Sequence, residues 1–164
     1  MSFDASVGGV SSNSYVLLSA AEDYFLGRLN TDSWDDAESD DQKAALMMAT
    51  ARLDSESYIG SVVSSTQRLQ WPRSWVPDRQ GKYYSSTAIP GVIQDATCEL
   101  ALALLMDPDL LGGSSDLSEF QNLQLGSLNV TPRVGTTAGA LPPNVLRLIV
   151  SVRLSGYMNR VVRA

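Results

Sequence analysis

The sequence predicts a mainly α-helical protein: a helical bundle with a long ordered loop, a small β-hairpin and a protruding C-terminal helix. Three observations favour this class. Several stretches carry apolar residues at helical spacing, residues 60–88 show no period but are rich in aromatic side chains, and prolines stand where helices are expected to begin or end. At 164 residues, the chain is long enough to bury a core without disulfides or metals.

The first two helices are expected where capping-box sequences precede apolar residues. One box at residues 19–22 predicts a helix to about Leu29, and a second at 39–42 predicts a helix to about Ser57. The stretch between them, residues 30–41, is polar and acidic apart from Trp34. It is therefore expected to be a solvated connector.

Residues 60–88 form either an ordered loop or a disordered segment. Trp71, Trp75 and Tyr83 favour order, because aromatic side chains can anchor a loop and long structureless loops usually have a functional reason. Pro72 is expected to hold Trp71 in an extended backbone state.

The loop interleaves aromatic and basic residues, and two interpretations of this mixture remain open. The basic residues are Arg68, Arg73, Arg79 and Lys82, and Tyr84 adds a further ring. They could form a platform on which single-stranded nucleic acid stacks. They could equally anchor the loop and bind carboxylates on a neighbouring protein, which the acidic composition of the body favours.

A third helix is predicted from Pro90 to Met106, where Asp107 and Pro108 stop it. Its second half is apolar nearly all round, so it is either the central helix of the bundle or covered by a neighbouring subunit.

A small hairpin is expected at residues 122–131, where apolar residues alternate around a Gly-Ser turn. The last helix is expected to open at Pro142 and run to about Val162. Its two apolar stripes point in roughly opposite directions, so the first half can pack on its own domain while the second docks elsewhere. A kink near Ser155 and Gly156, which would turn both stripes to one core, is the alternative.

Charge is divided unevenly along the chain. The net charge is −6, yet all 18 acidic residues lie at or before Glu119, and the last 45 residues carry five arginines and no acid. Such a tail suits an acidic partner or nucleic acid, while the body repels polyanions. Simple solvation of these arginines is the other interpretation.

The residue types exclude most catalytic chemistry. There is no histidine, which rules out the usual zinc sites and histidine-based triads, and the single Cys98 has no activating neighbour. The carboxylates of the connector lie where nothing would raise their pKa. We therefore expect no catalytic residue, cofactor or metal. The longest apolar run, from Leu100 to Met106, is too short to cross a membrane.

Several short motifs follow one another along the chain, and their residues, expected to be structural, are Trp71, Pro72, Arg73, Pro90, Cys98 and Glu99. The order of these motifs resembles that in the head-to-tail adaptor (head-completion) proteins of tailed bacteriophages, whose relatives often carry the label DnaT-like single-stranded-DNA-binding. The likeness also covers residues 125–130 and 141–143, and only the segments 110–120 and 131–140 match loosely. The order and spacing carry the likeness, since no single motif is diagnostic.

The resemblance implies a structural virion protein assembled in the host cytoplasm and placed in the neck, between portal and tail. Its subunits would form a ring, dodecameric in that family, which binds the portal protein and a tail or nozzle protein and extends the channel through which genomic DNA passes without specific binding. Residues 1–140 would be the adaptor domain, and 141–164 the portal-docking helix.

Two sets of contact residues follow as hypotheses. The portal-binding set is Arg147, Arg153, Leu154, Tyr157, Met158, Arg160, Val161 and Arg163. The inter-subunit set is Leu102, Leu105 and Met106. The alternative function is a single-stranded-DNA-binding module of replication.

Overall fold

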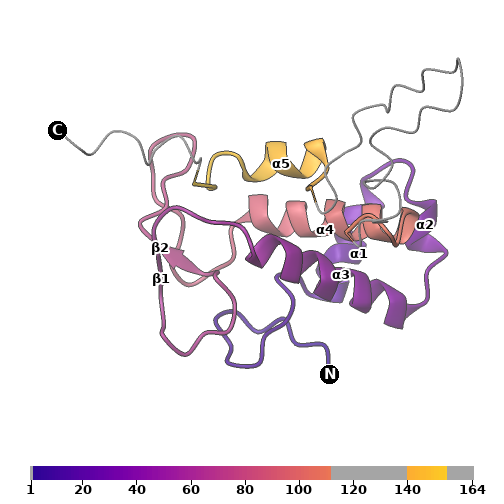
Figure 1. The fold of residues 1–164 in the computed structure, drawn as a ribbon, viewed down its shortest axis with the longest axis horizontal. Helices are drawn as coiled ribbons and strands as arrows, with labels where there is room; N and C mark the ends of the chain where they lie inside the picture. The colour runs from indigo at the N-terminus through magenta and orange to yellow at the C-terminus, as the bar shows by residue number, and fades with distance from the viewer. Residues whose placement is uncertain (1, 112–139, 155–164) are drawn as a thin grey trace, which may run out of the picture.

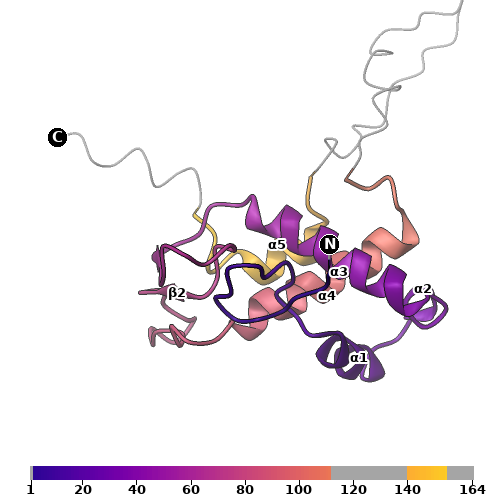
Figure 2. The same cartoon turned by 90° about the horizontal axis from the view of Figure 1, so that it is seen from below.

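Helix α4 lies at the centre of the fold. The computed structural model describes residues 2–111 and 140–154. Its helices are α1 (Leu18–Leu26), α2 (Asp32–Asp35), α3 (Ser39–Asp54), α4 (Gly91–Met106) and α5 (Pro143–Ile149). All the other helices contact α4: α3 and α5 run along it, and α1 and α2 lie towards one end (Figures 1 and 2). The mainly helical class is confirmed.

The central position of α4 explains why its sequence is apolar on several faces. Its buried positions run without a break from Ala96 to Ala101, which no one-sided helix would need. The helix begins directly after Pro90 and ends at Asp107, before Pro108, as expected. None of the helices in the described ranges is long and apolar enough to span a membrane.

The capping boxes predict the helix starts only approximately. Helix α1 begins at Leu18 with Leu17 as its N-cap, so Ser19 lies inside the helix, and no side chain caps either α1 or α3. Helix α3 does begin at Ser39, but its Gln42 side chain donates instead to the carbonyl of Trp34, at 2.9 Å. The two helices end at Leu26 and Asp54, three residues earlier than expected.

The expected solvated connector is wrong around Trp34. This side chain is 2% exposed and packs on Phe25, with ring centroids 4.5 Å apart. The short helix α2 forms around it, and α2 also contacts α4. Burial of two aromatic rings stabilises this segment although its neighbours are acidic.

The aromatic loop is ordered, and it contains a hairpin. Strands β1 (Ser61–Val62) and β2 (Arg73–Ser74) pair antiparallel, with Ser61 opposite Ser74. Figure 1 shows them at the end of the molecule opposite α2. The hairpin predicted at 122–131 lies outside the described residues.

The C-terminal helix is shorter than predicted, because the chain pairs with another segment after Ile149. Helix α5 packs on α4 and does not protrude, and residues 150–152 form a turn. Arg153 then makes a β-bridge with Tyr58, while Leu154 N–H donates to Ser57 O at 2.8 Å. These long-range bonds end the helix thirteen positions before Val162, although residues 155–164 themselves lie outside the described part.

Candidate nucleic-acid interface

Two motif residues of the loop, Trp71 and Arg73, are buried and stabilise the loop itself. Trp71 is 1% exposed and meets the Tyr58 ring edge to face, at 5.4 Å. The buried Arg73 guanidinium donates to the carbonyls of Ile59 at 2.9 Å and Gly60 at 2.7 Å. Desolvation lowers the pKa of Arg73. Neither side chain is available to stack on or attract a nucleic acid.

Trp75 and Tyr83 point the other way, into solvent. Their exposed fractions are 71% and 64%, and they form an edge-to-face pair with centroids 5.6 Å apart and planes at 86°. An open hollow of about 220 Å³ lies beside them, lined by Ser74, Trp75, Tyr83, Tyr84 and Ser86. We call the Trp75–Tyr83 pair with this hollow the aromatic corner. Exposed aromatic rings of this kind are unusual without a partner.

The backbone holds the aromatic corner in place. Tyr84 N–H donates to Val76 O at 2.9 Å, and Pro77 forms a β-bridge with Tyr83. Val76 is fully buried and anchors this small ladder in the core. Trp75 itself has a φ of 63°, a conformation rare for aromatic residues, which neighbouring pairings on both sides maintain. The two rings are therefore preorganised.

A tight turn at residues 78–82 carries two cations next to the corner. The Asp78 carboxylate accepts the backbone N–H groups of Gln80 and Lys82, each at 2.8 Å, and Gly81 adopts the left-handed conformation that closes the turn. Arg79 and Lys82 are both exposed. Within residues 2–111 and 140–154, no ion pair neutralises either of them.

Gly60 allows the hairpin to reach this geometry. Its φ is 78°, and a Cβ there would overlap the carbonyl oxygen of Ser74 and lie 2.8 Å from Val76 Cγ2. Because Ser74 and Val76 flank Trp75, the close approach at Gly60 sets the position of the aromatic corner.

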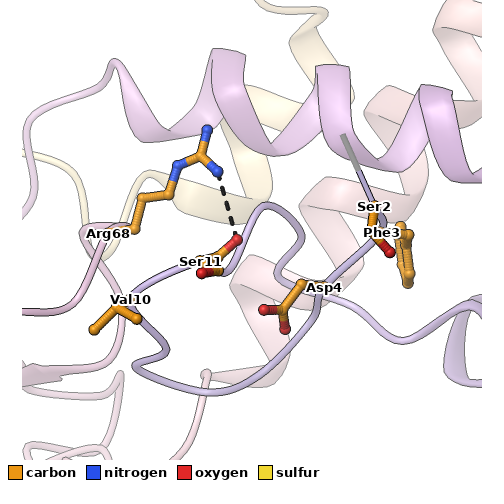
Figure 3. Close-up of a pocket in the computed structure, with 6 residues that line it drawn as sticks. All are labelled: Ser2, Phe3, Asp4, Val10, Ser11 and Arg68. Carbon is orange, nitrogen blue, oxygen red and sulfur yellow. Dashed lines mark hydrogen bonds between the residues drawn. The ribbon is translucent and has the colours of Figure 1, made fainter.

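A second hollow, of about 590 Å³, lies where the N-terminal segment faces Arg68 (Figure 3). The polar groups around it are engaged within the chain: the Arg68 guanidinium donates to Ser11 O at 3.4 Å, and the Asp4 carboxylate accepts from Ser6. The bond from Arg68 to Ser11, together with that from Arg68 N–H to Gly9 O at 3.2 Å, ties the N-terminal segment to the aromatic loop.

Glu99, one of the two motif residues of α4, is the centre of a structural polar cluster. The buried Glu99 carboxylate pairs with Arg28 and accepts hydrogen bonds from Tyr24 Oη at 2.7 Å and Asn144 Nδ2 at 2.9 Å. It thereby links α1, α4 and α5. Cys98 is buried, as expected, and burial beside acidic neighbours raises the pKa of its thiol to about 12.

The residues expected at the portal and subunit contacts differ in their exposure and in the partners they have within the chain. Arg147 is exposed on α5, but Arg153 pairs with Glu56 of its own chain at 2.5 Å. Leu154 is 46% exposed. Tyr157, Met158, Arg160, Val161 and Arg163 lie outside the described residues. Of the inter-subunit set, Met106 is 65% exposed, whereas Leu102 and Leu105 pack partly on the core.

Sequence reasoning grouped the loop aromatics together as anchors and missed their division into one buried and two exposed rings. The available signal was the Asp78–Gly81 turn, whose residue types favour a tight reversal between Trp75 and Tyr83. Such a reversal brings the flanking rings together. In the described ranges no cluster of residues could hold a metal ion.

A family model described as "Putative DnaT-like ssDNA binding protein" matches residues 3–164, nearly the whole chain. The chain belongs to this family. Neither the curated proteins nor the solved structures gave a match. The description of this DnaT-like family agrees with the alternative function derived from the sequence, and it does not confirm the phage adaptor.

Proposed function

We propose that the chain binds single-stranded DNA through the aromatic corner and the adjoining turn. The observation that carries this proposal is the solvent-exposed, preorganised Trp75–Tyr83 pair beside Arg79 and Lys82. Single-strand sites combine aromatic rings, on which bases stack, with cations that follow the backbone. The family description supports the same ligand.

The acidic composition is compatible with such a site because of where the acids lie. The densest acidic run, residues 32–41, surrounds α2, at the opposite end of the molecule from β1 and β2 (Figure 1). Helix α3 separates the two ends, and its 16 residues span about 24 Å. At 0.1 M salt the Debye length is about 10 Å, so this acidic end is screened from the corner. In the part of the chain that the structure describes, the turn beside the corner carries two exposed cations, Arg79 and Lys82, so we expect modest, salt-sensitive affinity.

The test is the anisotropy of a labelled thymine dodecamer titrated with the full chain. Trp75→Ala should weaken binding by about 10-fold or more, as expected for loss of a stacking ring, and Tyr83→Ala should weaken it by about threefold or more through loss of an edge-to-face contact. The log-log dependence of affinity on salt should have a slope of about −1.4 for two phosphate contacts, and Arg79→Ala or Lys82→Ala should each reduce it by about 0.7.

Two matched variants serve as controls. Leu26→Ala removes an exposed apolar side chain on α1, and Lys43→Ala removes a cation near the start of α3. Both should leave affinity within twofold of wild type. Equal binding by wild type, Trp75→Ala and Tyr83→Ala would refute the proposed site.

The second candidate function is the head-to-tail adaptor of a phage neck, which the sequence resemblance suggested. One structural observation favours it: Leu26, Leu29 and Met106 are 85%, 89% and 65% exposed, which suits contacts between copies of the chain in a closed ring. In this role the protein would act in the virion, between portal and tail proteins, without catalysis.

Co-expression with a portal protein distinguishes the two candidates. An adaptor should co-elute with the portal and give ring particles in electron micrographs, and a Leu26→Asp/Leu29→Asp variant should abolish the rings. Absence of rings and of co-elution, together with salt-dependent binding of the thymine strand, would eliminate the adaptor.

A further inference from the structure

The geometry of the aromatic corner limits how many bases it can hold. The planes of Trp75 and Tyr83 stand at 86°, so a flat ligand can lie parallel to only one of the two rings. A base parallel to one ring meets the other with its edge, which is a favourable arrangement for aromatic systems. Sandwiching a base between the two rings, or stacking one base on each in a continuous run, would require nearly parallel planes.

The hollow beside the rings is also small and partly polar. Its volume is about 220 Å³, and Ser74 and Ser86 contribute to its lining. Among the described residues, the structure records no hydrogen bond to either of these hydroxyl groups, whereas the neighbouring Ser85 hydroxyl pairs with Thr87 at 2.9 Å. The hydroxyls of Ser74 and Ser86 are therefore free to bond a ligand. A hydroxyl both donates and accepts, so it can meet the polar edge of any base.

We propose that the aromatic corner is a pocket for one unpaired nucleobase. The base stacks on Trp75, directs its edge to Tyr83, and receives hydrogen bonds from Ser74 and Ser86, while Arg79 and Lys82 contact the phosphates beside it. This inference rests on the proposed single-strand binding and adds to it the number of bases held and the tolerance of base identity.

The test compares octanucleotides that differ only in their bases. One strand carries eight thymines, one carries abasic spacers throughout, and a third carries a single central thymine among spacers. The fully abasic strand should bind about 10-fold to 100-fold more weakly than the thymine strand. The strand with a single thymine should bind as tightly as the full thymine strand after one correction. The full strand has several equivalent bases that can enter the pocket, which raises its observed affinity by a statistical factor. A single adenine or cytosine should do the same within about threefold.

Variants assign the hydrogen bonds. Ser74→Ala and Ser86→Ala should each weaken binding of the single-thymine strand by about threefold or more, and should leave the abasic strand unaffected. Ser65→Ala, at another exposed serine of the loop, is the control and should change neither.

Failure of this inference can be told apart from failure of the proposed function. If affinity rises with each base restored by more than the statistical factor, or if one base restores nothing while the full thymine strand still depends on Trp75, the single-base pocket is refuted and single-strand binding stands. If the full thymine strand does not bind, or binds equally well to wild type, Trp75→Ala and Tyr83→Ala, both are refuted.

Discussion

Glu99 Oε2 accepts a hydrogen bond from Asn144 Nδ2 at 2.9 Å, which joins α4 to α5 across 45 positions of sequence. The other oxygen of the same carboxylate accepts from Tyr24 of α1 and pairs with Arg28, which follows the end of that helix. One buried acid thus holds two helices against the central one.

Replacing this acid should destabilise the fold. Glu99→Gln removes the charge that Arg28 and Asn144 bind, and should lower the free energy of unfolding by about 1–3 kcal/mol, while Asn144→Ala should cost about 1 kcal/mol. Urea denaturation measures both. Glu38→Gln, at an exposed acid, is the control. A Glu99→Gln variant as stable as this control would contradict the role of the cluster.

Cys98 should be almost unreactive in the native protein. Burial, with Asp95 and Glu99 nearby, raises the pKa of its thiol from 9.0 to about 12, so the thiolate that reacts is scarce and inaccessible at pH 8. Labelling with a disulfide reagent should proceed only through unfolding, and denaturant should accelerate it by orders of magnitude. Rapid native labelling would show that the thiol is accessible.

The same shift predicts a pH dependence of stability. The pKa of the thiol is higher in the folded protein than in the unfolded chain. The contribution of Cys98 to the free energy of unfolding is therefore complete below pH 9 and is lost as the pH rises towards about 12. Between these two pH values, the free energy of unfolding of wild type should fall by about 1.4 kcal/mol per pH unit more than that of Cys98→Ala. Parallel stability curves for the two proteins would contradict this.

Gly60→Ala should disturb the aromatic loop. The added methyl group overlaps Ser74 O, and the left-handed φ of 78° is unfavourable for alanine, so we expect a loss of about 1–3 kcal/mol. Weaker binding of single-stranded DNA should follow, because Ser74 and Val76 move together with Trp75. Gly91→Ala, where a Cβ meets open space, is the matched control and should retain both properties.

The variant Arg73→Lys tests whether Arg73 stabilises the loop or contacts the DNA. Lysine keeps the charge but cannot reproduce the fork that bonds the carbonyls of Tyr58, Ile59 and Gly60. Unfolding free energy should fall by about 2 kcal/mol, whereas affinity for the thymine strand and its salt slope should stay within error where the variant is folded. A reduced salt slope would place Arg73 in the interface instead.

Local sequence signals were sufficient to predict where α4 begins and ends. They were not sufficient to predict which rings of the loop are buried or where α5 ends. Pro90 and Asp107-Pro108 mark the ends of α4 through backbone restrictions that act on the chain nearby. The burial of Trp34 depends on Phe25, and the end of α5 depends on Tyr58, which is distant in sequence. Likewise, composition cannot distinguish Trp71, which faces Tyr58 in the core, from Trp75, which faces solvent.

The most direct test of the central claim is photo-crosslinking of a 5-iodouracil-containing single strand to the full chain, followed by mapping of the modified residue by mass spectrometry. Base stacking on the aromatic corner predicts adducts at Trp75 or Tyr83, lost in Trp75→Ala/Tyr83→Ala and suppressed by excess unlabelled thymine strand. Adducts confined to other segments at saturating protein, with none at these two rings, would contradict the account.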